Sequence, residues 1–265
     1  TKPYPFWEWL IAQVRRDHPD VIFLAEAFTR PKVMGYLAKL GFTQSYSYFT
    51  WRNTKPEIEE YFTHLATGDG REYMRPNLFT NTPDILHAFL QESNPAAFKI
   101  RLILAATLGA TFGIYSGFEL CEGRAVPGSE EYFDSEKYQF RHWDWDRPGH
   151  IKDLVAAVNR IRREHTGLQY DHGLRFHDTD NPTIVAYSKT APDAASTVLV
   201  VVNLDPDNVQ HGWVDVSPAQ LGAAPDAPFA VHDLLTDTTF AWSGERHYVR
   251  LDPGVLPAHI LVRAS

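Results

Sequence analysis

The sequence contains a single cysteine, Cys121, among 265 residues. One thiol cannot form an internal disulfide bond, and a zinc site built from several thiolates is excluded. We expect Cys121 to be a buried or half-buried thiol. Histidine is more frequent, with 12 residues, but these are scattered and no pair has a metal-binding spacing on one helix. The sequence therefore predicts no metal site and no cofactor.

Positive charge and long apolar runs are also scarce. The formal net charge is −8 and no run of five basic residues occurs, which argues against nucleic acid or an anionic membrane as a partner. The longest apolar run, residues 100–114, is interrupted by arginine, threonine and glycine, so it predicts no membrane span. No glycine-rich phosphate loop and no signal peptide are visible. We expect a cytoplasmic protein.

Alternating elements occupy the first two thirds of the chain. Short apolar runs alternate with longer amphipathic patterns, which is typical of parallel βα units. Proline at a first helical position and Gly41 after the last one mark the limits of one helix. Helices are predicted over 6–16, 31–40, 56–65, 94–108 and 151–165, and strands over 21–25, 42–50, 77–80 and 112–116.

After Gly167 the pattern changes to short strands separated by turn-forming residues such as those at 178–182 and 205–208. This spacing predicts an antiparallel all-β domain, either a sandwich or a Greek key. The predicted strands cover 174–177, 183–189, 197–203, 212–216, 229–234, 239–242, 248–251 and 259–262. We therefore divide the chain into an α/β domain, 1–169, and a β domain, 170–265.

Two carboxylates stand where parallel βα folds carry their working groups, just after the carboxyl ends of strands. Glu26 ends the first predicted strand, and Asp84 follows the strand at 77–80. Two carboxylates at one strand edge suit glycosyl chemistry, because one serves as acid or base while the other stays ionised. The alternative is that Glu26 is a paired structural charge and that Asp84 caps a helix starting near Ile85.

Aromatic residues are frequent in the loops on the same predicted edge. A flat apolar ring with a polar edge matches the face of a pyranose, so the group favours a sugar site. Packing of the loops onto the sheet is the alternative for any single ring. The rings in question are Tyr46, Tyr48, Trp51, Tyr132, Tyr138, Trp143 and Trp145.

Three segments resemble a known family. Val21–Pro31, Asn77–Asp84 and Phe112–Glu119 resemble the fifth, seventh and eighth strands of α-amylase superfamily barrels, and the all-β tail resembles their C-terminal domain. Within that superfamily, the loops are most similar to the bacterial maltosyltransferases that extend α-1,4-glucans from maltose 1-phosphate. The resemblance implies the C-terminal half of a (β/α)8 barrel followed by a β-sandwich.

The resemblance also implies roles for individual residues. Glu26 matches the general acid/base, and Asp84 matches the carboxylate that stabilises the transition state. Lys137 and Tyr138 match positions implied to bind the phosphorylated donor, and Trp51 resembles a ring lining the sugar cleft. Amylases usually have histidine immediately before that aspartate, where this chain has Pro83.

One part of the family pattern is absent from the sequence. The nucleophilic aspartate of the family follows the fourth barrel strand, and this chain begins after it. The implied activity is retaining maltosyl transfer from maltose 1-phosphate to an α-1,4-glucan, with phosphate release, in glycogen-type biosynthesis. We expect this chain alone to be inactive, and its partners to be the missing N-terminal half and a second copy in a homodimer. An α-amylase-like hydrolase or other transglycosidase, and an inactive sugar-binding fragment, are the alternatives.

Overall fold

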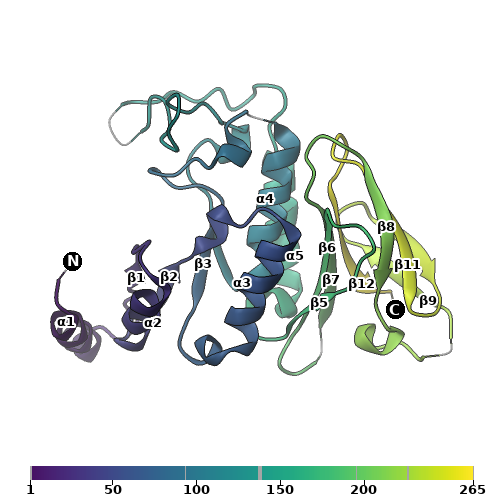
Figure 1. Ribbon diagram of the computed structural model, residues 1–265, viewed down its shortest axis with the longest axis horizontal. Helices are drawn as coiled ribbons and strands as arrows, with labels where there is room; N and C mark the ends of the chain where they lie inside the picture. The colour runs from purple at the N-terminus through teal and green to yellow at the C-terminus, as the bar shows by residue number, and fades with distance from the viewer. Residues whose placement is uncertain (1, 93, 137–138, 195, 226, 265) are drawn as a thin grey trace.

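The computed structural model describes residues 2–92, 94–136, 139–194, 196–225 and 227–264 (Figure 1). Its first part alternates helices and strands, as the sequence predicts. The elements are α1 (Tyr4–Asp17), β1 (Leu24–Ala25), α2 (Pro31–Lys39), β2 (Gln44–Tyr46), α3 (Lys55–Thr67), β3 (Pro76–Phe79), α4 (Pro95–Leu108), β4 (Thr111–Gly113) and α5 (Lys152–Glu164).

The four strands of this part form one parallel sheet in the order β1-β2-β3-β4. Leu24 pairs with Gln44, Ser45 with Pro76, and Asn77 with Thr111 in successive ladders. Parallel pairing brings all four carboxyl ends to the same edge of the sheet. The candidate residues that directly follow the strands therefore lie along one edge of the sheet.

The strand predicted over residues 42–50 is too long. The structure has only Gln44–Tyr46 as β2, and Tyr48–Trp51 form the short 3-10 helix η1. Ser47 begins η1, because its hydroxyl accepts the backbone N–H of Phe49 at 3.5 Å. The turn replaces the strand because its carbonyl groups are bound by a buried arginine of α4.

Helix α4 is the most deeply buried helix of the described chain. Asn94 caps its start by accepting the Ala96 N–H at 3.0 Å, with proline at the first helical position. Its one buried cation, Arg101, donates to the carbonyl oxygens of Phe49 and Arg52, each at 2.7 Å. Burial lowers the pKa of Arg101 to about 9. The guanidinium thereby fixes η1 against α4.

All eight strands predicted for the last part are confirmed. A six-stranded antiparallel sheet has the order β10-β9-β12-β7-β6-β5, and β11 pairs with β8 in a second sheet. The strands are β5 (Leu174–His177), β6 (Ile184–Thr190), β7 (Thr197–Asn203), β8 (Gln210–Asp215), β9 (Phe229–Asp233), β10 (Thr238–Trp242), β11 (Arg246–Leu251) and β12 (Ala258–Arg263).

Two hydrophobic cores share the six-stranded sheet. One face, with Tyr187 and Val200, packs against α4 and α5 in a core that continues into the parallel sheet (Figure 1). The other face, with Ala186 and Val201, packs against the two-stranded sheet of β8 and β11. Strand β6 is buried on both faces, which explains why its sequence is apolar without strict alternation.

Two cations close the C-terminal end of α4. Lys189 of β6 donates to the carbonyl oxygen of Leu108 at 3.0 Å, and Arg162 of α5 donates to those of Ala106 and Ala110. Helix carbonyl groups without an internal partner need donors of this kind when water is excluded. Burial lowers the pKa of Lys189 to about 8, although the carboxylate of Asp171 opposes that shift.

We predict that Lys189 makes stability depend on pH in the alkaline range. Between about pH 8 and about pH 10.5 the folded chain loses the Lys189 proton while the unfolded chain keeps it, so the free energy of unfolding rises with pH. The urea midpoint of the wild type should therefore rise between about pH 7 and about pH 9.5, and this rise should be larger than that of Lys189→Met. The exposed Lys32→Met should retain the wild-type rise; the same rise in Lys189→Met would contradict the assignment.

Candidate functional site

Glu26 lies immediately after β1 and is exposed. It lines a surface hollow of about 760 Å³ together with Trp7 and Phe28. Burial raises the pKa of Tyr46, and the negative charge of Glu26 raises it further. The carboxylate and the phenol therefore lie close enough to interact electrostatically at the carboxyl ends of β1 and β2.

Aromatic rings continue from this point along the strand edge. The Phe28 ring lies 5.8 Å from that of Tyr46 and 5.3 Å from that of Trp51, measured between centroids. Trp51 is half-buried, and its indole N–H donates to both carboxylate oxygens of Glu130 at 3.2 Å. Trp51 is thus held in two ways: Arg101 binds carbonyl groups of and beside η1, and Glu130 of the long loop after β4 binds the indole N–H.

Asp84 lies in the loop after β3 and is exposed. Thr82 and Ile85 exchange two backbone hydrogen bonds around it, at 3.0 and 3.3 Å, and the Asp84 N–H donates to the Thr82 hydroxyl at 3.2 Å. No helix begins at Ile85. The helix-cap alternative for Asp84 is therefore wrong: a bridged turn between Thr82 and Ile85 replaces the expected helix start.

Asn81 organises the same loop, although no sequence motif marks it as a candidate. Its side chain is fully buried. The amide oxygen accepts the Tyr115 N–H at 2.9 Å, and the amide nitrogen donates to the Tyr132 hydroxyl. One side chain thus joins the loop after β3, the chain after β4 and the long loop. The packing alternative also holds for Tyr132, which is 5% exposed. Asparagine in the segment NTPD was the available signal.

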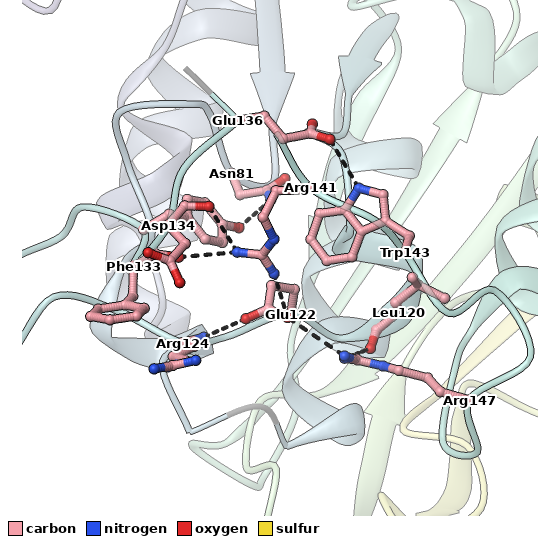
Figure 2. A network of polar contacts seen from close by, with 11 residues as sticks. Asn81, Leu120, Glu122, Arg124, Phe133, Asp134, Glu136, Arg141, Trp143 and Arg147 are labelled. Atoms are coloured by element: carbon pink, nitrogen blue, oxygen red, sulfur yellow. Dashed lines mark hydrogen bonds and ion pairs between the residues drawn. The ribbon is translucent and has the colours of Figure 1, made fainter. Parts of the chain in front are cut away.

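A buried carboxylate holds the long loop, residues 121–149. The Glu122 carboxylate forms ion pairs with Arg141 at 3.4 Å and with Arg147 at 3.5 Å. It also accepts a hydrogen bond from the backbone N–H of Arg124 at 3.2 Å (Figure 2). Arg141 also donates to the carbonyl oxygens of Phe133 and Asp134, at 3.1 and 2.8 Å. The two arginines therefore draw distant parts of the loop onto one carboxylate.

Trp143 fixes the loop against the chain after β4. Its ring lies over Gly117, where a Cβ atom would come within 2.5 Å of the ring and the φ angle is +86°. Only glycine suits both the space and the backbone. The Trp143 indole N–H donates to Glu136 at 3.0 Å, beside the cation of Arg141 (Figure 2). Trp145, by contrast, is 47% exposed.

Three further residues from the sequence prediction are Lys137, Tyr138 and Cys121. Lys137 and Tyr138, the expected donor-binding residues, lie outside the described residues. Cys121 is buried, as predicted, and burial raises the pKa of its thiol to about 11. Within the described ranges, no group of three or more histidine, cysteine or carboxylate side chains is placed to hold a metal ion. No helix in those ranges has the length and hydropathy needed to cross a membrane.

Comparison with known proteins gives a consistent result. The family model described as "GLGE, C-terminal" matches residues 176–262. The α-1,4-glucan:maltose-1-phosphate maltosyltransferase of Cereibacter sphaeroides is 52% identical over 257 residues, which are 97% of this chain and 38% of that protein. A Streptomyces coelicolor enzyme of the same name is 53% identical over 98% of this chain and 39% of its own length. The chain is homologous to these maltosyltransferases.

Solved structures show the same fold at much lower identity. The α-amylase of Geobacillus thermoleovorans, complexed with acarbose, superposes with a TM-score of 0.74 at 17% identity and covers 99% of this chain and 57% of its own. An Anoxybacillus α-amylase gives a TM-score of 0.70 at 16% identity. These likenesses show an amylase-like α/β fold. This chain spans less than two fifths of the maltosyltransferases named above.

We predict that Glu122→Gln destabilises the protein by about 1–3 kcal/mol. The substitution keeps the shape but leaves two arginines without their counter-charge, and breaking a buried pair on one side is costly. The expected loss is smaller than for a fully buried ion pair, because the Arg147 side chain is 34% exposed and its charge is partly screened by water. Urea unfolding measures the change, with the exposed Glu131→Gln as a control. Equal stability of the two variants would show that the network contributes little.

Proposed function

We propose that this chain forms part of an enzyme that transfers a maltosyl group from α-maltose 1-phosphate to the non-reducing end of an α-1,4-glucan, releasing phosphate with retention of configuration. The observation that carries the proposal is identity above 50%, along nearly the whole chain, to proteins named for that reaction. The donor, the acceptor and the activity are carried over from those relatives.

The proposed reaction assigns one task to each carboxyl group. Glu26 protonates the departing phosphate oxygen and then removes the proton of the acceptor hydroxyl. Asp84 stays ionised and stabilises the positive charge that develops on the sugar. Lys137 and Tyr138 bind the donor phosphate, and Trp51 lines the cleft. A nucleophilic carboxylate completes a double displacement; we place it in the part of the relatives that this chain does not span.

The finer architecture belongs to the same proposal. We assign residues 1–169 to the C-terminal four βα units of a (β/α)8 barrel and residues 170–265 to a β-sandwich domain. Among the described residues, β1 pairs with β2 alone, and Leu24 of β1 and the nearby Ile22 are 46% and 65% exposed. An N-terminal half of the barrel that pairs with β1 would cover them. The setting that the family implies is cytoplasmic glycogen-type synthesis by a homodimer.

Hydrolysis is the competing reaction. The α-amylase likeness concerns the fold, and Pro83 stands where amylases usually have the histidine that precedes the aspartate. Water in place of the glucan acceptor would give maltose, whereas transfer lengthens the glucan. Product analysis after phosphate release therefore distinguishes the two.

We predict that Glu26→Ala lowers phosphate release from maltose 1-phosphate by about 10²–10⁴-fold in the complete protein, because both the acid and the base are lost. A coupled phosphate assay gives the rate. Glu245→Ala removes an exposed carboxylate of the β domain and should leave turnover unchanged. Near-normal turnover of Glu26→Ala would rule out the acid/base assignment.

We predict that Asp84→Asn slows phosphate release by at least about 10²-fold while the protein stays folded at the assay temperature. The amide is nearly isosteric, and the turn around it is held by Thr82, so the substitution keeps the shape and removes the negative charge proposed to stabilise the sugar. Thermal unfolding is measured beside turnover, with the exposed Asp69→Asn as the matched control. A variant that keeps its rate, or that loses rate only through unfolding, would remove Asp84 from the mechanism.

A further inference from the structure

Two large aromatic side chains stand together on the outer face of the two-stranded sheet. Trp213 of β8 and Tyr248 of β11 are register partners, and their ring centroids lie 5.6 Å apart at an interplanar angle of 67°. They are 42% and 52% exposed. Cross-strand aromatic pairs stabilise sheets, so packing alone is one explanation for them. Their surroundings suggest a binding role.

The rings border a surface hollow of about 510 Å³, whose opposite wall is the turn at residues 180–183. That wall is fixed: the Asp180 carboxylate accepts the backbone N–H of Trp213 at 2.7 Å, and the Asn181 side-chain amide donates to the His211 carbonyl oxygen at 2.9 Å. A Cβ atom at Gly212 would come within 2.7 Å of the Asp180 carboxylate, so glycine allows the turn to lie against β8. The hollow is therefore built before any ligand arrives.

The polar edges of both rings remain available. Within the described part of the chain, neither the indole N–H of Trp213 nor the hydroxyl of Tyr248 makes a hydrogen bond to protein. The nearby cation, Arg246, is already paired with Asp215 at 2.9 Å and Asp180 at 3.4 Å. Its guanidinium carbon also lies 5.6 Å from the centroid of the Trp213 ring, over that ring. The hollow thus offers the exposed parts of two rings and their hydrogen-bonding edges, without an uncompensated positive charge for a phosphate.

These features match a neutral pyranose chain. The C–H face of a sugar ring packs on an aromatic face, and its hydroxyl groups meet donors and acceptors at the ring edge. The two rings are far from coplanar, which suits a curved α-1,4-linked chain better than a flat β-linked one. Strands β8 and β11 lie at the opposite end of the molecule from β1, which Glu26 follows directly in the sequence (Figure 1).

We propose that Trp213 and Tyr248 form a second α-glucan-binding site, separate from the strand edge that carries Glu26 and Asp84. The choice of an α-1,4-glucan as ligand rests on the proposed function. A polymer long enough to touch both sites is held by both, which raises its effective concentration at the reacting end. A short oligosaccharide gains nothing from the second site.

The test is binding and turnover by the complete protein. Affinity electrophoresis in gels containing soluble amylose should show a dissociation constant about tenfold larger for Trp213→Ala than for the wild type, and likewise for Tyr248→Ala. Phosphate release with a maltotetraose acceptor should stay unchanged, whereas the apparent KM for long amylose should rise. Trp213→Phe keeps an aromatic face and should restore most of the binding. Tyr170→Ala removes an aromatic residue that is 47% exposed elsewhere, and should bind like the wild type.

The outcomes separate the two proposals. Wild-type amylose binding in both alanine variants would overturn the second site and leave the pair as a packing contact. A lowered melting temperature of Trp213→Ala would show that this variant loses binding through misfolding. The folded double variant Trp213→Phe, Tyr248→Ala is then measured in its place, and full amylose binding by that variant also overturns the second site. If the wild type releases no phosphate from maltose 1-phosphate but needs Trp213 to bind amylose, the proposed reaction fails and the site stands.

Discussion

The whole described fold depends on satisfying the ends of one apolar helix. Helix α4 is buried along nearly its full length, so water cannot reach its terminal carbonyl groups. Lys189 comes from the β region and Arg162 from α5, and both donate to carbonyl oxygens at the C-terminal end of α4. One hydrophobic core runs from the parallel sheet through α4 and α5 to the antiparallel sheet, and the two cations add polar links at the end of α4.

The same helix supports the strand edge with the candidate catalytic groups. Arg101 is buried in its middle and binds the carbonyl oxygens of the turn that ends in Trp51. Glu130 of the long loop then takes the Trp51 N–H, while Asn81 ties that loop to the chain after β3 and β4. Trp51 and the loops that follow β3 and β4 are thus held by residues that the sequence pattern did not single out.

The sequence predicted the type and order of the helices and strands, because apolar periodicity, proline starts and glycine ends act locally. It failed where tertiary contacts decide. Residues 48–51 look like strand until Arg101 binds the carbonyl groups of Phe49 and the following Arg52, and Ile85 looks like a helix start until Thr82 closes the turn. The carboxylates at 26 and 84 were chosen as candidates by their place after strands, and their roles stay predictions. Glu122 was not, because nothing local marks which arginines will reach it.

The sharing of one core between two halves has a consequence during synthesis on the ribosome. The residues that cover α4 include Tyr187 and Val200, which are translated long after Leu108. Until β6 and β7 leave the exit tunnel, the emerging α/β segment keeps an apolar helix face uncovered and the carbonyl of Leu108 without its lysine. Nascent chains expose such surfaces to chaperones and to each other. The core of the α/β part is therefore completed only after the β part, which follows it in the chain, has been synthesised.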